Sequence, residues 1–136
     1  MYKPTLEERI DRDDWKFEQT QKCFCCGRKA TYGMHLDIHE ISRRKFKGYF
    51  HRCNYLLLCN GFTDHAPCHN QFDIGGRDNK VLQLAVKQLI DPEDYSLTEW
   101  LSRFDPAESR SPTDEPYITQ REVDVEAEKW RRRSRG

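Results

Sequence analysis

The fold of this chain depends on the stretch R-C-N-Y-L-L-L-C at residues 52–59, which contains the longest apolar run of the 136 residues. Within it, residues 55–58 have the length and the continuous apolar character of a short buried strand. A second strand is expected at residues 35–41, where apolar residues alternate with polar ones. The sequence therefore predicts two short strands separated by a basic loop, with a cysteine at the end of the second strand.

The chain has few large apolar residues. Leu, Ile, Val and Phe number 27, and 21 of them lie between residues 23 and 104. This distribution predicts a folded domain at residues 22–104, a charged helical extension at 1–21, and a flexible linker with a charged tail at 105–136. The last stretch of that tail, residues 121–136, changes from acidic to basic and could form a helix or remain a tail with a cationic tip. Because the apolar share is low, hydrophobic burial alone is not expected to hold the domain together.

Helical patterns flank the two strands. Residues 80–90 carry apolar side chains at helical spacing and are followed by an Asp-Pro pair, which ends a helix. A capping box opens a second helix at Ser96. The apolar stripe of that helix consists of Leu97, Trp100, Leu101 and Phe104. A third helix is expected from Thr5, with Trp15 and Phe17 as candidate docking points. The fold class is therefore α+β.

Charge is balanced overall but divided unevenly. Lys plus Arg and Asp plus Glu number 23 each, which argues against a histone-like coat of nucleic acid and against an acidic mimic of it. Residues 22–52, however, hold eight basic side chains against two acidic ones. Aromatic residues are interspersed among them, a pattern that suits contact with nucleic-acid phosphates. The candidate contacts are Arg43, Arg44, Lys45, Lys47 and Arg52.

All six cysteines and all five histidines lie between residues 23 and 69. The N-terminus has no apolar signal-peptide core, so we expect a reducing compartment, where clustered cysteines are metal ligands more often than disulfides. A C-x-x-C-G knuckle and a second, wider cysteine pair predict a structural zinc site. Its ligands are Cys23, Cys26, Cys59 and Cys68. Because the second pair is widely spaced, a ligand set that uses Cys25 or His65 is the alternative.

A second polar set is interleaved with these cysteines. His39 and Glu40 end the first strand, Asn54 precedes the second, and His69 follows the last cysteine. His69 and Asp73 are four residues apart, so on a helix their side chains would project from one face. Imidazoles together with a carboxylate suit a divalent cation that keeps open positions.

The order C-x-x-C, His39, Asn54, L-L-L-C and Cys68-His69 resembles the HNH endonuclease family. The resemblance covers about residues 23–73 and is greatest to small phage-encoded and prophage-encoded members. It implies a small zinc-stabilised ββα-metal fold with additional C-terminal helices. In that fold two antiparallel strands and a helix enclose one divalent ion.

The resemblance also implies roles for individual residues. His39, His69 and Asp73 would hold a catalytic Mg²⁺, Mn²⁺ or another divalent ion, and Asn54 would fix the loop between the strands. Glu40 occupies the position where the family usually has a histidine as general base, so it would accept the proton of the attacking water. An alternative register makes Asp37 the ligand and His39 the base. It is disfavoured because the intervening Ile38 would put both side chains on the same face of the strand.

The function that the resemblance implies is divalent-metal-dependent hydrolysis of DNA phosphodiesters, in the cytoplasm of a bacterial host and without a membrane. DNA is the expected partner, and a phage protein is a further candidate. The alternative is a non-catalytic zinc-binding module for nucleic acid or protein, in which Glu40 marks lost chemistry. A redox role for the C-x-x-C pair is disfavoured, because no βαβ pattern surrounds Cys23.

Overall fold

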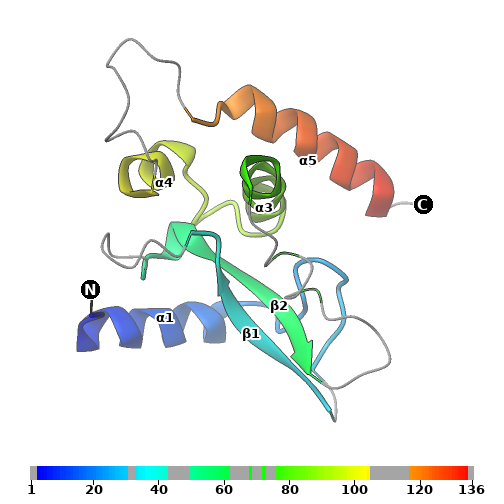
Figure 1. Ribbon diagram of the computed structural model, residues 1–136. Coiled ribbons are helices and arrows are strands. Elements are labelled where there is room, and N and C mark those ends of the chain that lie inside the picture. The colour runs from blue at the N-terminus through cyan, green and yellow to red at the C-terminus, as the bar shows by residue number, and fades with distance from the viewer. Residues whose placement is uncertain are drawn as a thin grey trace.

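The computed structural model describes residues 3–30, 33–42, 50–61, 68, 72, 76–104 and 117–134. Four α-helices and two strands follow one another along these residues (Figure 1). They are α1 (Leu6–Glu18), β1 (Met34–Glu40), β2 (Tyr55–Gly61), α3 (Arg77–Ile90), α4 (Leu97–Phe104) and α5 (Gln120–Ser134), with a short 3-10 helix η1 (Arg52–Asn54) leading into β2. The expected α+β class is confirmed.

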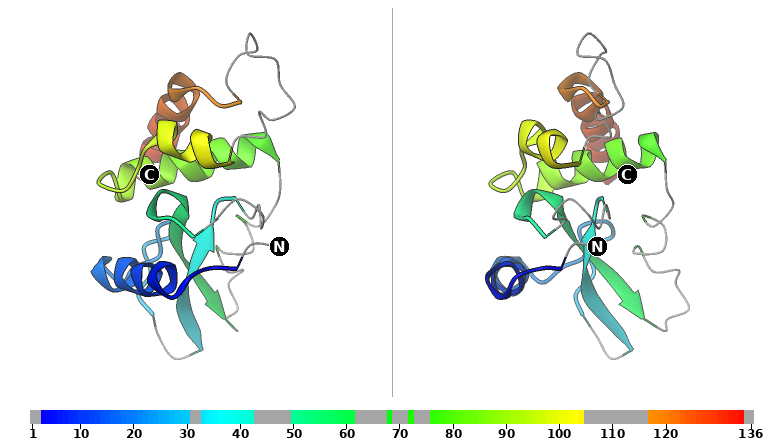
Figure 2. Two further views of the ribbon diagram at one scale, coloured as in Figure 1. Left: turned by 90° about the vertical axis from the view of Figure 1, so that its left-hand side faces the viewer. Right: turned by 60° about the vertical axis from the view of Figure 1, so that its left-hand side comes forward.

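The two strands form an antiparallel pair, in which Leu36 lies opposite Cys59 and His39 lies opposite Leu56. α3 lies above this pair and α1 lies beside it, in Figure 1 and in both views of Figure 2. The three leucines of β2 are fully buried. A strand that is covered on both faces has a continuous apolar sequence, so the run that predicted β2 also reflects its central place in the core.

Helix α1 begins at a capping box and docks through one aromatic side chain. The Thr5 hydroxyl accepts the Glu8 N–H at 3.1 Å, and the Glu8 carboxylate accepts the Thr5 N–H at 2.8 Å. Trp15 is completely buried against the rings of Phe24 and Tyr55. Phe17 is 87% exposed. The prediction of docking is therefore confirmed for Trp15 and wrong for Phe17, because residues two apart point to nearly opposite sides of a helix.

A buried polar network fastens α1 to the end of α3. The Trp15 indole N–H donates to the Asp91 carboxylate at 2.8 Å, and the Lys87 ammonium donates to the same carboxylate oxygen at 2.6 Å. The Lys87 nitrogen also lies 4.7 Å from the centre of the Trp15 ring. Burial lowers the pKa of Lys87, and the charge of Asp91 opposes that shift. The buried ammonium thus has both an ion-pair partner and an aromatic face.

Helices α3 and α4 follow their sequence signals. α3 ends at Ile90, directly before the Asp-Pro pair, as expected. Ser96 caps α4 by accepting the Glu99 N–H at 3.2 Å, and Leu97, Trp100 and Phe104 are its buried face. Within the part of the chain that the structure describes, no helix has the length and apolar content needed to cross a bilayer.

Of the two possibilities for the end of the chain, a helix or a tail, the structure has the helix α5, and its packing was not predicted. Residues 105–116 lie outside the described residues, but α5 packs along α3 with Val123 and Ala127 buried, and Ile118 just before the helix is buried as well. Arg77 of α3 pairs with Glu122 of α5. Val123 and Ala127 are four residues apart and so share one face of the helix. This face was not predicted because only Val123 and the small Ala127 form it, which gives a weak apolar pattern in the sequence. The core therefore extends beyond residue 104.

Candidate functional site

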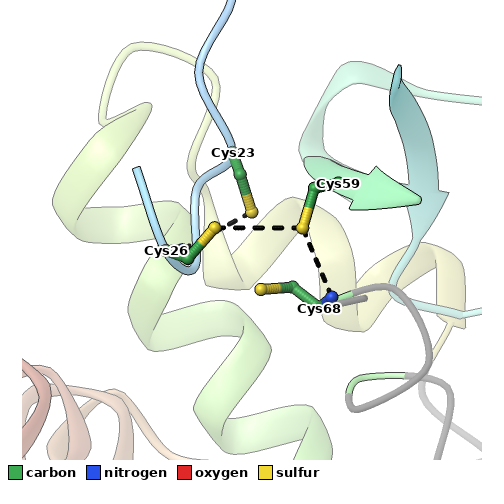
Figure 3. Close-up of side chains that lie close together, drawn as sticks. All are labelled: Cys23, Cys26, Cys59 and Cys68. Carbon is green, nitrogen blue, oxygen red and sulfur yellow. Dashed lines mark hydrogen bonds between the residues drawn. The ribbon is translucent and has the colours of Figure 1, made fainter. Parts of the chain in front are cut away.

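Four cysteine sulfur atoms gather between the N-terminal knuckle and β2. Their Sγ atoms all lie within 4.8 Å of one another, and they face one another in Figure 3. They belong to Cys23, Cys26, Cys59 and Cys68, the set expected from the spacing. Cys25 lies outside this set, and His65 lies outside the described residues. These four cysteines lie close enough together to hold a metal ion such as zinc.

The knuckle is a tight turn around the first sulfur. The N–H groups of Cys25 and Cys26 point at Cys23 Sγ, at 3.3 and 3.5 Å. Gly27 has a φ of 76°, a left-handed conformation that glycine adopts without strain. The Cys23 N–H donates to the Arg28 carbonyl at 2.9 Å and closes the turn. The C-x-x-C-G sequence therefore folds into a turn that presents two sulfurs on one side.

The distances between the sulfurs suit a tetrahedral ion better than a disulfide. Cys26 Sγ and Cys59 Sγ are 3.8 Å apart, and all four cysteines are free. A disulfide would need about 2.05 Å. Zinc at about 2.3 Å from each of four sulfurs implies tetrahedral edges of about 3.8 Å. The observed separation therefore matches the edge of a zinc–thiolate tetrahedron.

Burial opposes ionisation of part of this cluster. It raises the pKa of Cys26 to about 11 and raises that of Cys68 as well. For Cys23 burial also opposes the charged form, but backbone hydrogen bonds, first from Cys26, leave its pKa lowered. Thiolates packed together repel one another, and a divalent cation among them favours the charged form. The donor set thus has the chemistry of a metal site.

His39 lies at the end of β1 and contacts α3 through one buried amide. The imidazole is 2% exposed, and its Nε2 lies 2.8 Å from Oε1 of Gln83. The Gln83 side-chain nitrogen donates to the carbonyl of Phe72 at 3.1 Å and to the Asn79 side chain at 2.5 Å. One amide thus joins the end of β1 to the main chain at residue 72.

This network fixes the tautomer of His39. The Phe72 carbonyl can only accept a hydrogen bond, so the side-chain nitrogen of Gln83 must face that carbonyl. The side-chain oxygen of Gln83 then faces the imidazole. His39 Nε2 therefore donates, and in the neutral ring Nδ1 carries the lone pair. A metal-ligating histidine characteristically donates its other ring N–H to a fixed acceptor. Gln83 supplies such an acceptor.

Asn54 closes the loop between the strands. Its side chain pairs with both backbone groups of Ser42, accepting the N–H at 2.9 Å and donating to the carbonyl at 2.9 Å. The same oxygen accepts the Trp100 indole N–H at 3.0 Å, and Asn54 is fully buried. These contacts join the residue before β2 to Ser42, two residues after β1, and to α4.

The side chains of Glu40 and His39 point to different sides of β1, although the two residues are adjacent in the sequence. Neighbouring residues of a strand point to opposite faces, and here His39 contacts α3 while Glu40 contacts α1. Glu40 Oε1 accepts from Arg12 at 2.7 Å, and the Arg12 guanidinium covers the ring of Phe50. The structure thus places Glu40 in a contact that holds α1 against the sheet.

The candidate DNA contact Arg52 is also engaged with α1. Its guanidinium lies 2.8 Å from both Asp11 and Glu18, and hydrogen bonds to these two carboxylates raise its pKa. Contact between Arg52 and a phosphate would compete with both acids. Six other predicted site residues lie outside the described residues: Arg43, Arg44, Lys45, Lys47, His69 and Asp73.

Two residues at the site were not predicted from the sequence. Gln83 is buried beside His39, and Lys80 donates to the Ile41 carbonyl at 2.6 Å, just beyond β1. Both belong to α3. A glutamine or lysine is an ordinary residue in a helix, so only the packing of α3 on the sheet reveals these contacts.

No protein-family model, curated protein or solved structure matches the chain. The resemblance to the HNH family therefore rests on the sequence motifs alone.

Proposed function

We propose that the chain is a divalent-metal-dependent DNA endonuclease of the HNH type, with a phage-like, zinc-stabilised ββα-metal fold. The single observation that carries this proposal is the hydrogen-bonded chain from His39 through Gln83 to Phe72. It joins the first candidate metal ligand, at the end of β1, to the segment whose sequence contains His69 and Asp73.

This segment has two described anchors. Cys68 is 1% exposed and belongs to the cysteine cluster, and Phe72 is 4% exposed with its carbonyl bound to Gln83. His69 and Asp73 follow these anchors directly in the sequence. The link from residue 72 through Gln83 to His39 supports a shared ligand set for one divalent ion.

The chemistry follows from that ligand set. A bound Mg²⁺, Mn²⁺ or similar ion supplies Lewis-acid stabilisation of charge on the scissile phosphate. Gln83 holds the His39 ring with Nδ1 as the basic nitrogen, and Asn54 fixes the loop that follows β1. The cysteine cluster, with zinc bound, would join the knuckle to β2 and to residue 68 and so keep the hairpin rigid.

Glu40 is the proposed proton acceptor for the attacking water, because it follows His39 in the motif. Its carboxylate is held by the Arg12 guanidinium at 2.7 Å. The contact also favours a second candidate function, a zinc-stabilised DNA-binding module without catalysis, in which Glu40 has only a structural role.

Nicking of supercoiled plasmid DNA tests the proposal. The protein is incubated with plasmid and Mg²⁺, Mn²⁺ or Ni²⁺, beside His39→Ala and His69→Ala variants. His35→Ala is the matched control, since His35 lies on the same strand with an exposed side chain. We expect nicking by the unaltered chain and by the control, and its loss in both variants. Absence of nicking with every ion, or equal nicking by His69→Ala, would overturn the proposal, and DNA binding without nicking would favour the second function.

A further inference from the structure

Helix α5 has its charges segregated along its length. After Arg121, its acidic residues come first, at Glu122, Asp124, Glu126 and Glu128, and the other basic residues follow at Lys129, Arg131, Arg132 and Arg133. The three arginines are exposed. The end of α5 therefore presents a compact cationic tip to solvent.

This tip lies next to the candidate site. Trp130, one residue before the arginines, packs its ring against Phe72 with centroids 6.3 Å apart. Phe72 is the residue whose carbonyl shares Gln83 with His39. Three successive contacts therefore connect the cationic end of α5 with the end of β1.

A surface depression of about 420 Å³ separates the tip from the cysteine knuckle. Trp130 and Arg131 line one side, Lys22 and Phe24 line the other, and Leu89 of α3 contributes apolar surface. The knuckle also exposes Arg28 and Lys29, and residues 22–30 contain no acidic side chain. Both sides of the depression therefore carry positive charge.

Part of this charge has a local explanation. Cations at a helix C-terminus interact favourably with the helix dipole. Arg131 and Arg132 also lie 3.6 and 3.3 Å from Glu128. Exposed pairs of this kind contribute little to stability, and the helix gives no reason for a cationic knuckle on the facing side. Facing surfaces of like charge repel one another, and a polyanion between them would relieve that repulsion.

We propose that the cationic tip of α5 (Lys129, Arg131, Arg132 and Arg133) and the knuckle cations (Lys22, Arg28 and Lys29) together bind the phosphate backbone of DNA. The identity of the ligand as DNA rests on the proposed function, whereas the binding itself does not require cleavage. Guanidinium groups recognise phosphate oxygens in a bidentate manner and carry no sequence information. This surface would hold the duplex beside the site without selecting its sequence.

The test compares two triple variants that remove the same charge. Arg131→Gln/Arg132→Gln/Arg133→Gln removes the tip arginines, and Lys3→Gln/Arg9→Gln/Lys16→Gln removes three cations of the N-terminal region. Binding to a short fluorescein-labelled duplex is measured by fluorescence anisotropy without added divalent ions, over a series of salt concentrations. We expect the tip variant to bind on the order of tenfold or more weakly at ~0.1 M salt, with a salt slope smaller by about 2–3.

The control variant is expected to stay within about twofold of the unaltered chain, and an Arg→Lys version of the tip variant to retain most of the affinity. Unchanged affinity of the tip variant, or an equal loss in the control, would overturn the inference. A lower melting temperature of the tip variant with unchanged affinity would also overturn it, because the arginines would then only stabilise the helix. Since anisotropy does not depend on cleavage, failure of this inference and failure to nick plasmid are separate results.

Discussion

His39 and Gln83 form a buried hydrogen bond of 2.8 Å between imidazole Nε2 and the amide oxygen. The orientation of that amide is set by the Phe72 carbonyl, which accepts a hydrogen bond from the amide N–H. The imidazole therefore has a fixed tautomer and a fixed plane before any ion binds, and Gln83 is a positioning residue for the candidate metal site.

Removal of Gln83 tests this relationship. In Gln83→Leu the imidazole loses its acceptor, so we expect about 10–100-fold more divalent ion to be needed for half-maximal plasmid nicking. Gln83→Glu keeps an acceptor for Nε2 and should retain more activity. Gln88→Leu on the same helix is the control, since Gln88 bonds Asp124 instead. An unchanged ion requirement in Gln83→Leu would refute the positioning role.

The cysteine cluster predicts a metal content of about one zinc per chain. Cys26→Ser should lose that zinc and lower the melting temperature, because zinc binding contributes to folding. Cys25→Ser is the matched control, since Cys25 is the neighbouring residue but lies outside the set of four. Elemental analysis and thermal melting provide the measurements. Zinc retained in Cys26→Ser, or lost in Cys25→Ser, would contradict the assignment.

The Arg12–Glu40 pair separates a structural role from a catalytic one. Loss of a hydrogen bond to a charged group costs about 1.5–3 kcal/mol, so Arg12→Gln and Glu40→Gln should both lower the free energy of unfolding. If Glu40 is also the base, only Glu40→Gln should abolish nicking at temperatures where both variants are folded. Equal nicking by the two variants would leave Glu40 a purely structural residue.

Replacement of Asn54 should lower stability more than replacement of Asn60. Asn54→Ala leaves the backbone groups of Ser42 and the Trp100 indole without their partner, at about 1–3 kcal/mol for each unsatisfied group. Asn60 is half-buried and bonds Asp37, so Asn60→Ala should cost less. Urea denaturation of the two variants measures the difference, and equal losses would contradict the bridging role of Asn54.

His51 predicts a fall in stability on acidification. Burial, assisted by the nearby Arg103, holds the pKa of His51 below its ordinary value of 6.5, and its Nδ1 accepts the Cys53 N–H at 3.1 Å. Below pH 6.5 His51 therefore binds a proton in the unfolded chain but stays neutral in the folded chain. The free energy of unfolding falls as the pH drops toward the folded pKa. Urea midpoints at about pH 7.5 and about pH 5.5 should differ more for the unaltered chain than for His51→Asn, which retains a capping side chain. A larger acid sensitivity in His51→Asn would reverse the predicted sign.

Much of the secondary structure could be predicted because the sequence patterns that determine it are local. The apolar run of β2, the Asp-Pro pair after α3 and the cap at Ser96 each act within a few residues, and all three elements are present. The four cysteines could be predicted because tetrahedral coordination restricts their spacing and residue type.

The contacts of the site depend on packing between distant elements. Gln83 meets His39 across 44 positions of the sequence, and Arg12 meets Glu40 across 28. Neither pair has a periodicity or motif that marks it. The docking of α5 on α3 was missed for a related reason, since a face made of Val123 and Ala127 carries too little apolar surface to stand out from the charged residues around it.

The network of Trp15, Lys87 and Asp91 has a consequence for how far the chain can be shortened. A fragment that starts at the knuckle would keep Lys87 and Asp91 but lose the indole that covers the ammonium and donates to the carboxylate. Tyr55 and Phe24 would lose their aromatic neighbour as well. The region that contains the candidate metal ligands is therefore not a portable module, and α1 has to accompany it when it is grafted into another protein.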